Sequence, residues 1–95
     1  MSQLRLKLFI AGDSPRAREA AANLARLCEE QLGGEVEVET VDVVEQPELA
    51  EAYRILTTPT VVRDAPLPRR RATGDLGDAT QVLAALALYP TRTTS

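Results

Sequence analysis

Hydrophobic and polar residues alternate in two stretches near the start of the chain, and a period of two is typical of strands. Residues 4–11 read LRLKLFIA, so the leucines share one face while Arg5, Lys7 and Phe9 share the other. Residues 35–43 read EVEVETVDV and alternate in the same way. The pattern therefore predicts a first strand at about 4–11 and a second strand at about 35–43.

Between these strands the apolar residues recur every three or four positions, which predicts a helix from about Pro15 to Leu32. Asp13 or Ser14 can cap its N-terminus, and a proline suits its first turn. The two glycines at 33–34 end the helix. The first half of the chain is thus predicted to be strand, helix, strand.

Shorter elements are predicted in the second half. A short helix is expected over about 47–55, after a glutamine–proline step, and a third strand is expected over 60–63. The letters RDAPLP, which follow, predict a loop. An edge strand is expected from Arg69 to Thr73, and Gly74 ends it.

The last predicted element is a helix over 79–89. Asp75 or Asp78 can cap its N-terminus, and Pro90 stops it. The tail over 90–95 is expected to fray.

The predicted elements run in the order β-α-β-α-β-β-α. The first strand–helix–strand unit should be a right-handed parallel crossover, and the last two strands an antiparallel hairpin. Pro59 directly precedes the third strand, a position where its missing N–H is tolerated. This order, with a proline entering the third strand, resembles the thioredoxin fold, an α/β three-layer sandwich. The resemblance implies a cis bond at Pro59, beside the turn AGDSPR.

The bulk composition bounds the class of protein. A chain of 95 residues makes one small domain, predicted over 1–95 with an ordered part at about 4–89. A net charge of −3 does not favour nucleic-acid binding, which depends on neutralising phosphates. No apolar run is long enough to span a membrane, and the N-terminal letters lack the features of a signal peptide. A single cysteine excludes an internal disulfide, so the expected compartment is the cytoplasm.

The residues that catalysis needs are missing from this sequence. It contains no histidine, which excludes a Ser-His-Asp triad. The turn that carries C-x-x-C in thioredoxin-like redox enzymes reads GDSPR, and Cys28 lies far along the first helix on its apolar face. Asp13, Asp42, Asp75 and Asp78 have the spacing of turns and caps rather than of a metal site. We therefore expect no catalytic residue, cofactor or metal, and a binding module is favoured over an enzyme.

Two charged clusters have two interpretations each. The three arginines at 69–71 are either a solvated edge that discourages strand-to-strand aggregation or a docking patch for an acidic protein surface. The row Glu35, Glu37 and Glu39 is either a solvated sheet face or a selective interaction face.

An ordered series of motifs resembles the family of the circadian clock protein KaiB over about residues 4–89. The series consists of LKLFIAG with Pro15, VDV with QPELAE, ILTTPT, a loop with two prolines followed by Arg70-Arg71, GDL at 74–76, and the leucine-rich last element. A single motif of this series is not specific. The resemblance depends on the order and spacing of all the motifs together.

The resemblance implies a non-enzymatic function. KaiB proteins bind the ring of N-terminal domains of the hexameric, ATP-bound KaiC ATPase-kinase and oppose its autophosphorylation. In cyanobacteria the complex also captures KaiA and displaces an output histidine kinase. The family also changes fold: a tetramer with a different C-terminal half exchanges with a thioredoxin-like monomer, which binds KaiC. We therefore expect a monomer or a homo-tetramer.

The expected change of fold involves the half of the chain that starts near Pro59. Gly74 and Asp75 belong to this half, as does the last element, where the family usually reads GLDL. This chain reads ALAL, with Ala85 in place of the glycine and Ala87 in place of the aspartate. Both changes favour a helix over 79–89, because alanine has the higher helix propensity. We therefore expect the chain to rest mainly in the thioredoxin-like state.

The expected partner face combines likeness and difference. Arg54, Arg70 and Arg71 match positive positions of the family, and we expect them to contact the partner. Glu37 and Glu39 stand where relatives often carry a small residue and a lysine, on an edge strand suited to β-augmentation. We therefore expect a cognate KaiC with compensating charge.

Two other functions stay open. One is a KaiB-like, thioredoxin-like adaptor or sensor module with a non-clock signalling partner. The other is a thioredoxin-class redox enzyme, against which the missing C-x-x-C argues.

Overall fold

The computed structural model describes residues 4–88 and contains the predicted elements in the predicted order. They are β1 (Arg5–Ile10), α1 (Pro15–Gln31), β2 (Glu37–Asp42), α2 (Pro47–Ala52), β3 (Thr60–Ala65), β4 (Arg70–Thr73) and α3 (Ala79–Ala85). The prediction of a β-α-β-α-β-β-α fold is therefore confirmed. The predicted fraying of 90–95 lies outside the described residues.

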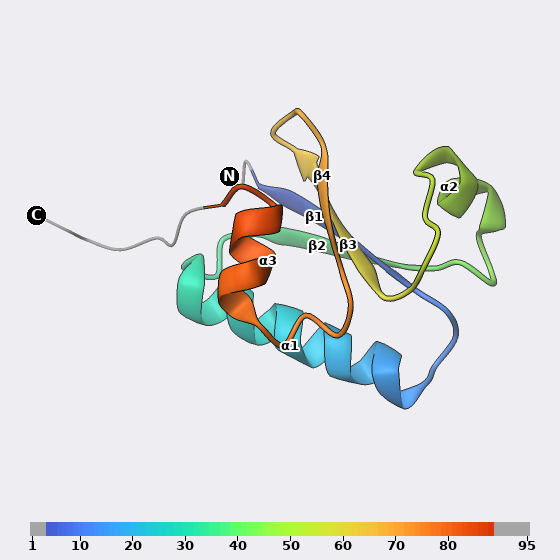
Figure 1. The fold of residues 1–95 in the computed structure, drawn as a ribbon, viewed down its shortest axis with the longest axis horizontal. Helices are drawn as coiled ribbons and strands as arrows, with labels where there is room; N and C mark the ends of the chain where they lie inside the picture. The colour runs from blue at the N-terminus through green and yellow to red at the C-terminus, as the bar shows by residue number, and fades with distance from the viewer. Residues whose placement is uncertain (1–3, 89–95) are drawn as a thin grey trace, which may run out of the picture.

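The four strands form one mixed sheet in the order β2-β1-β3-β4. β1 and β2 are parallel, as the crossover through α1 requires, and β3 is antiparallel to both β1 and β4. Helices α1 and α3 pack on one face of the sheet, and α2 lies over one end of the other, which makes three layers (Figure 1). We call these the α1 face and the α2 face.

The α1 face holds the larger hydrophobic core. Alternate residues of β1, Leu6 and Leu8, pack there against Leu24 and Leu27 of α1 and against Leu86 at the end of α3. Helix α1 begins where the Ser14 side chain accepts a hydrogen bond from the Ala17 N–H.

A smaller apolar cluster lies on the α2 face. Phe9, Val41 and Val62 are fully or almost fully buried, and the ring of Tyr53 packs at 5.2 Å from the ring of Phe9. Because α2 has only six residues, this cluster covers one end of the face, and charged side chains occupy the rest.

The segment before β3 approaches the turn between β1 and α1, as the resemblance implied. The Thr58–Pro59 bond is cis, and Pro59 and Ser14 line one small hollow of about 110 Å³. The Gly12 N–H, in the same turn, donates to the Asp42 carboxylate at the end of β2. This hydrogen bond ties the β1–α1 turn to the adjacent strand.

The RDAPLP loop prediction was wrong for Asp64 and Ala65, and Arg63 belongs to β3, as the predicted strand over 60–63 implied. β3 continues through Ala65, because Arg63 and Asp64 find polar partners on opposite faces of the sheet. Arg63 is almost completely buried, and its guanidinium donates to the carbonyls of Pro68 and Ala87. The Arg63 Nε makes no hydrogen bond among the described residues.

The end of the last helix also differs from the prediction. α3 ends at Ala85 rather than 89, and Ala87 has φ 55°, a left-handed conformation outside the helix. Ala85 lies in the last turn, so helix propensity applies there. It does not apply at Ala87, where a Cβ is unfavourable. The expectation that both alanines favour a helix was therefore wrong for Ala87.

The turn before α3 uses the residues that the sequence marked. Gly74 has φ 103°, a conformation that glycine adopts without steric cost. The Asp75 carboxylate accepts from the Gly77 N–H, and the Asp78 carboxylate caps α3 by accepting from the Gln81 N–H. Of the two aspartates that could cap the helix, Asp78 is the one that does.

Candidate partner-binding surface

The two predicted glutamates lie on the outer strand of the sheet, on its α2 face. Glu37 and Glu39 stand directly opposite Arg5 and Lys7 of β1 and pair with them at 3.2 and 2.6 Å. Both carboxylates remain about 60% exposed. The glutamates are therefore already paired within the chain and are still accessible to a further cation.

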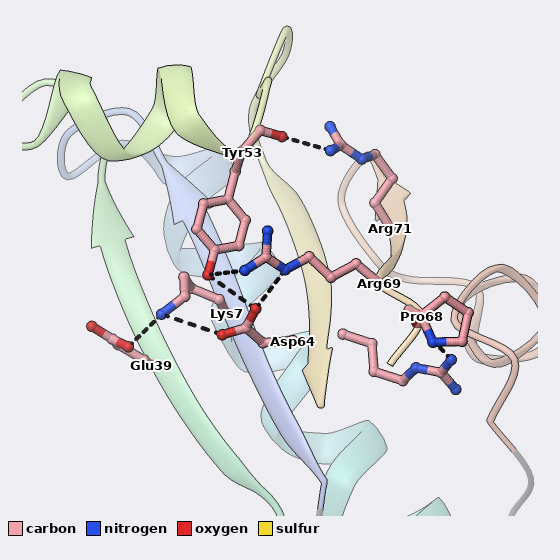
Figure 2. A network of polar contacts seen from close by, with 8 residues as sticks. Lys7, Glu39, Tyr53, Asp64, Pro68, Arg69 and Arg71 are labelled. Carbon is pink, nitrogen blue, oxygen red and sulfur yellow. Dashed lines mark hydrogen bonds and ion pairs between the residues drawn. The ribbon is translucent and has the colours of Figure 1, made fainter. Parts of the chain in front are cut away.

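Lys7 belongs to a polar network that crosses the α2 face (Figure 2). Its Nζ lies 3.9 Å from the Asp64 carboxylate, which also accepts hydrogen bonds from the Tyr53 hydroxyl and the Arg69 Nε, both at 2.9 Å. The Arg69 guanidinium lies 4.3 Å from the centre of the Tyr53 ring. The network therefore connects charged side chains of β1, β2 and β3 to Tyr53 at the end of α2.

The same contacts shift two pKa values. The hydrogen bond to Glu39 raises the pKa of Lys7, although burial opposes the shift. Partial burial, and then the hydrogen bond to Asp64, raise the pKa of Tyr53. Both groups therefore keep their protons at neutral pH, and the network carries a lysine cation and a neutral tyrosine.

The predicted arginines have different environments. Arg71 donates to the carbonyls of Tyr53 and Arg54 at 2.6 and 2.8 Å, so it holds the end of α2 against β4. Arg54 has φ 55° and is exposed next to this contact. Arg70 is exposed and stands opposite the buried Arg63 in the β3–β4 pairing. Within residues 4–88, no carboxylate lies within ion-pair distance of Arg54, Arg70 or Arg71.

The structure thus divides the predicted set. Arg54, Arg70 and Arg71 gather at the β4 edge, whereas Glu37 and Glu39 lie on the β2 edge at the other side of the sheet. The predicted fold-change residues form a third group, before β3 and around α3: Pro59, Gly74, Asp75, Ala85 and Ala87.

Sequence reasoning missed an apolar patch beside α2. Leu56 is 95% exposed and Val44 is 70% exposed, and a hollow of about 350 Å³ lies among Val43, Pro47 and Ile55. Leu56 follows α2 without belonging to any periodic pattern, and that isolation is the signal that could have revealed it. Exposed apolar patches on a small domain mark interaction sites.

The single thiol lies away from all these surfaces. Cys28 is packed in the core of the α1 face, and burial raises the pKa of its thiol. A raised pKa disfavours the thiolate that redox exchange needs. Within residues 4–88, no three Cys, Asp or Glu side chains gather as metal ligands, and no helix is long and apolar enough to cross a membrane.

Known proteins match this chain over most of its length. The KaiB domain family matches residues 7–88. The circadian clock protein KaiB3 of Synechocystis is 41% identical over 90 residues, which are 95% of this chain and 88% of that protein. The circadian clock oscillator protein KaiB of Synechococcus elongatus is 41% identical over 83 residues, which cover 87% of this chain and 81% of that protein.

Solved structures show the same fold. The N-terminal domain of Synechococcus elongatus SasA superposes with a TM-score of 0.66 at 28% identity, over 92% of this chain and 86% of that one. Mitochondrial thioredoxin 3 of Saccharomyces cerevisiae superposes with a TM-score of 0.68 at 19% identity, over 92% of this chain and 79% of that one. The predicted thioredoxin-like architecture is therefore confirmed.

Proposed function

This chain belongs to the KaiB family of circadian clock proteins, and we propose that it is a non-enzymatic timer protein that binds the KaiC ATPase-kinase. It docks on the ring of N-terminal KaiC domains and modulates the phosphorylation cycle of KaiC. The partner is a cognate KaiC, and KaiA or an output histidine kinase are further candidates. The proposed site of action is the cytoplasm.

The observation that most directly supports this proposal is the exposed apolar patch beside α2. Leu56 and Val44 expose most of their side chains to water at one end of the molecule. Burying such side chains against a partner is favourable by about 25 cal/mol per Å² of apolar area. The patch is therefore suited to protein binding. Val44 lies in the connection before α2, and Leu56 lies in the segment that joins α2 to the cis-proline turn.

Charged residues after α2 and on β4 set the proposed specificity. Arg54 follows α2 directly and is exposed, and Arg70 and Arg71 lie on the adjacent β4 edge. These three cations lack a carboxylate partner among the described residues, so an acidic partner surface complements them. Glu37 and Glu39 form the more distant, acidic part of the proposed contact face.

The family's change of fold is part of the proposal. In the structure, residues 79–85 are helical and the architecture is thioredoxin-like, which is the KaiC-binding form in the family. We assign the monomer to this form and the homo-tetramer to the alternative one. We assign Pro59, Gly74, Asp75, Ala85 and Ala87 to this change of fold.

Gel filtration with KaiC from the same genome, in the presence of ATP, tests the binding. We expect the wild type to co-elute with the ring and Leu56→Ser to lose co-elution. Leu67→Ser is the matched control, because Leu67 is 74% exposed but lies in the β3–β4 loop. Equal binding by Leu56→Ser and the wild type, or loss of binding by both variants, would contradict the proposed patch.

Charge reversal tests the arginines separately. Arg54→Glu and Arg70→Glu should weaken co-elution, whereas Arg26→Glu, an equal change on the exposed side of α1, should not. Arg71 is left unchanged because its guanidinium holds the end of α2. If the wild type never joins the ring, even after hours of incubation, the proposed KaiC function fails.

The likeness to the SasA domain favours one alternative, a KaiB-like adaptor or sensor module with a non-clock signalling partner. The same gel filtration separates the two functions. An adaptor of this kind would not co-elute with KaiC. It would bind a different partner, and Leu56→Ser would lose that binding.

A further inference from the structure

Strand β4 ends the sheet with backbone groups that point into solvent. The Gly74 N–H donates to the Pro59 carbonyl in the segment that leads to β3. By the alternation of an antiparallel ladder, Arg71 and Thr73 therefore turn their N–H and C=O groups away from β3. Within residues 4–88, these outward groups make no backbone hydrogen bond. The β4 edge can therefore accept an added strand.

On the α2 face, this edge carries positive charge. Ala72 packs in the core of the α1 face, so its neighbour Arg71 lies on the α2 face. Arg54 lies beside Arg71, whose guanidinium donates to the Arg54 carbonyl at 2.8 Å. Both acceptors of Arg71 are neutral carbonyls, so its charge is not compensated, and its guanidinium retains further N–H groups. A side chain of an added strand on this face therefore meets two cations that have no carboxylate partner among the described residues.

On the α1 face, the same edge opens into a groove of about 650 Å³ between β4 and α3. Its walls include the small apolar side chains of Ala72, Val82 and Ala85. The charged residues that line it are two of each sign, namely Arg16, Arg71, Asp75 and Asp78. The groove therefore has no net charge to attract a carboxylate, and its small apolar walls leave space for a larger apolar side chain.

We propose that the β4 edge binds an extended segment of a partner protein in which acidic and large apolar residues alternate. Successive side chains of a strand point to opposite faces of the sheet. A segment paired with β4 therefore places its acidic side chains beside Arg54 and Arg71 and its apolar side chains in the groove beside α3. The inference rests on the proposed partner-binding function, and it specifies the chemistry of the segment that the β4 edge recognises.

The probe is a fluorescent synthetic peptide of about seven residues in which leucine and glutamate alternate. Anisotropy measures its binding to the full chain at concentrations up to about 1 mM, without KaiC. It should bind at least about tenfold more tightly than a peptide of the same composition with its glutamates adjacent, or than one with lysine in place of glutamate. Arg54→Glu should remove the preference for glutamate over lysine, and Arg26→Glu, on the exposed side of α1, should retain it.

Methylation of the peptide backbone tests the strand pairing without any change to the protein. Alternate residues of a strand donate their N–H groups toward the same edge. N-methylation of one alternate set, either the glutamates or the leucines, should therefore abolish binding, whereas N-methylation of the other set should be tolerated. Equal effects of the two sets would overturn the proposal.

A variant of β4 tests the same pairing from the side of the protein. Thr73→Pro removes an outward N–H and leaves the hydrogen bond from Gly74 to Pro59 in place. It should weaken binding of the alternating peptide at least about tenfold, whereas Thr73→Ala, which retains the N–H, should bind as the wild type does. Equal binding by the two variants, or a wild type that does not distinguish the alternating peptide from its controls, would overturn the proposal. The methylated peptides decide the question if Thr73→Pro does not fold.

These measurements are separate from the test of the proposed function, because KaiC is absent from them. A chain that co-elutes with KaiC but does not bind the alternating peptide would contradict the strand pairing alone. A chain that binds the peptide but never co-elutes with KaiC would contradict the KaiC function alone.

Discussion

The first half of the described chain, residues 4–46, is regular, whereas the second half, residues 47–88, is strained. The first half contains the 17-residue α1 and two six-residue strands with clear alternation. Among the described residues, all three non-glycine residues with positive φ lie in the second half: Arg54, Leu76 and Ala87. A left-handed residue with a Cβ costs about 1–2 kcal/mol. The second half therefore holds its conformation at a local cost that the first half avoids.

This difference shows which part of the chain can change its fold with the smallest loss of stability. Helix α3 has only seven residues, and the segment after it is held by the Arg63 guanidinium, whose Nε has no hydrogen-bond partner within residues 4–88. Buried polar atoms without partners and left-handed residues both reduce the stability of one conformation relative to another. Leu76, Ala87 and Arg63 thus lie in the part of the chain, from about Pro59 onward, for which the family resemblance implied an alternative fold, and Arg54 lies just before it.

The largest expected effect comes from the regular half. Leu24→Ala should lower the free energy of unfolding by about 2–5 kcal/mol, because Leu24 is 1% exposed and fills the core between α1 and the sheet. Urea unfolding measures the change. Ala22→Ser, on the exposed side of α1, should stay within about 0.5 kcal/mol. A loss below about 1 kcal/mol for Leu24→Ala would mean that α1 contributes little to the core.

Arg63→Ala should have the next largest effect, about 1–3 kcal/mol, because it leaves the carbonyls of Pro68 and Ala87 without their donor. The loss should be local as well as global. Amide exchange at Leu88, whose N–H donates to Leu83, should accelerate more than exchange in α1. Uniform acceleration over the whole chain would contradict a local role at the end of α3.

Glycine at two neighbouring alanines should change stability in opposite directions. Ala85→Gly should cost about 1 kcal/mol because Ala85 is helical. Ala87→Gly should stabilise this fold by about 0.5–1 kcal/mol because it relieves a left-handed alanine. Thermal unfolding of both variants measures the difference. Loss of stability in both would show that α3 extends through Ala87.

The smallest effect concerns the contact between the halves, where Lys7 of the first meets Tyr53 of the second. Both pKa values are raised, so their contribution is complete below the unfolded pKa values and is lost as pH rises through the folded ones, above about pH 10. Tyr53→Phe should therefore reduce the alkaline loss of stability. The Cys28 thiol shifts in the same direction, so Cys28→Ala is the background for the comparison. If stability fell with alkaline pH as steeply in Tyr53→Phe as without this substitution, Tyr53 would not contribute to the alkaline loss.

The regular half is also the half that its sequence predicts well. Alternation and a 3.6-residue period place β1, α1 and β2 to within about two residues. In β1 and α1 the reason is that buried residues repeat with the period of each element. The errors fall in the second half. An arginine and an aspartate suggested a loop where β3 continues, since their partners come from distant residues.

The candidate site was predictable only in part. Arg70 lies on the predicted edge strand, so its exposure could be expected, whereas Arg54 was expected only from the family resemblance. The role of Arg71 could not, because its acceptors are carbonyls of α2, which no side-chain pattern reveals. The pairing of Glu37 and Glu39 with β1 depends on strand register, which the alternation alone leaves open.

Amide hydrogen exchange of the chain, alone and bound to the KaiC ring, tests the proposed binding surface most directly. We predict slower exchange over residues 44–58, which contain the Leu56 patch and the Arg54 turn, with no change in α1. Slower exchange confined to α1, with residues 44–58 unchanged, would contradict the proposed docking surface.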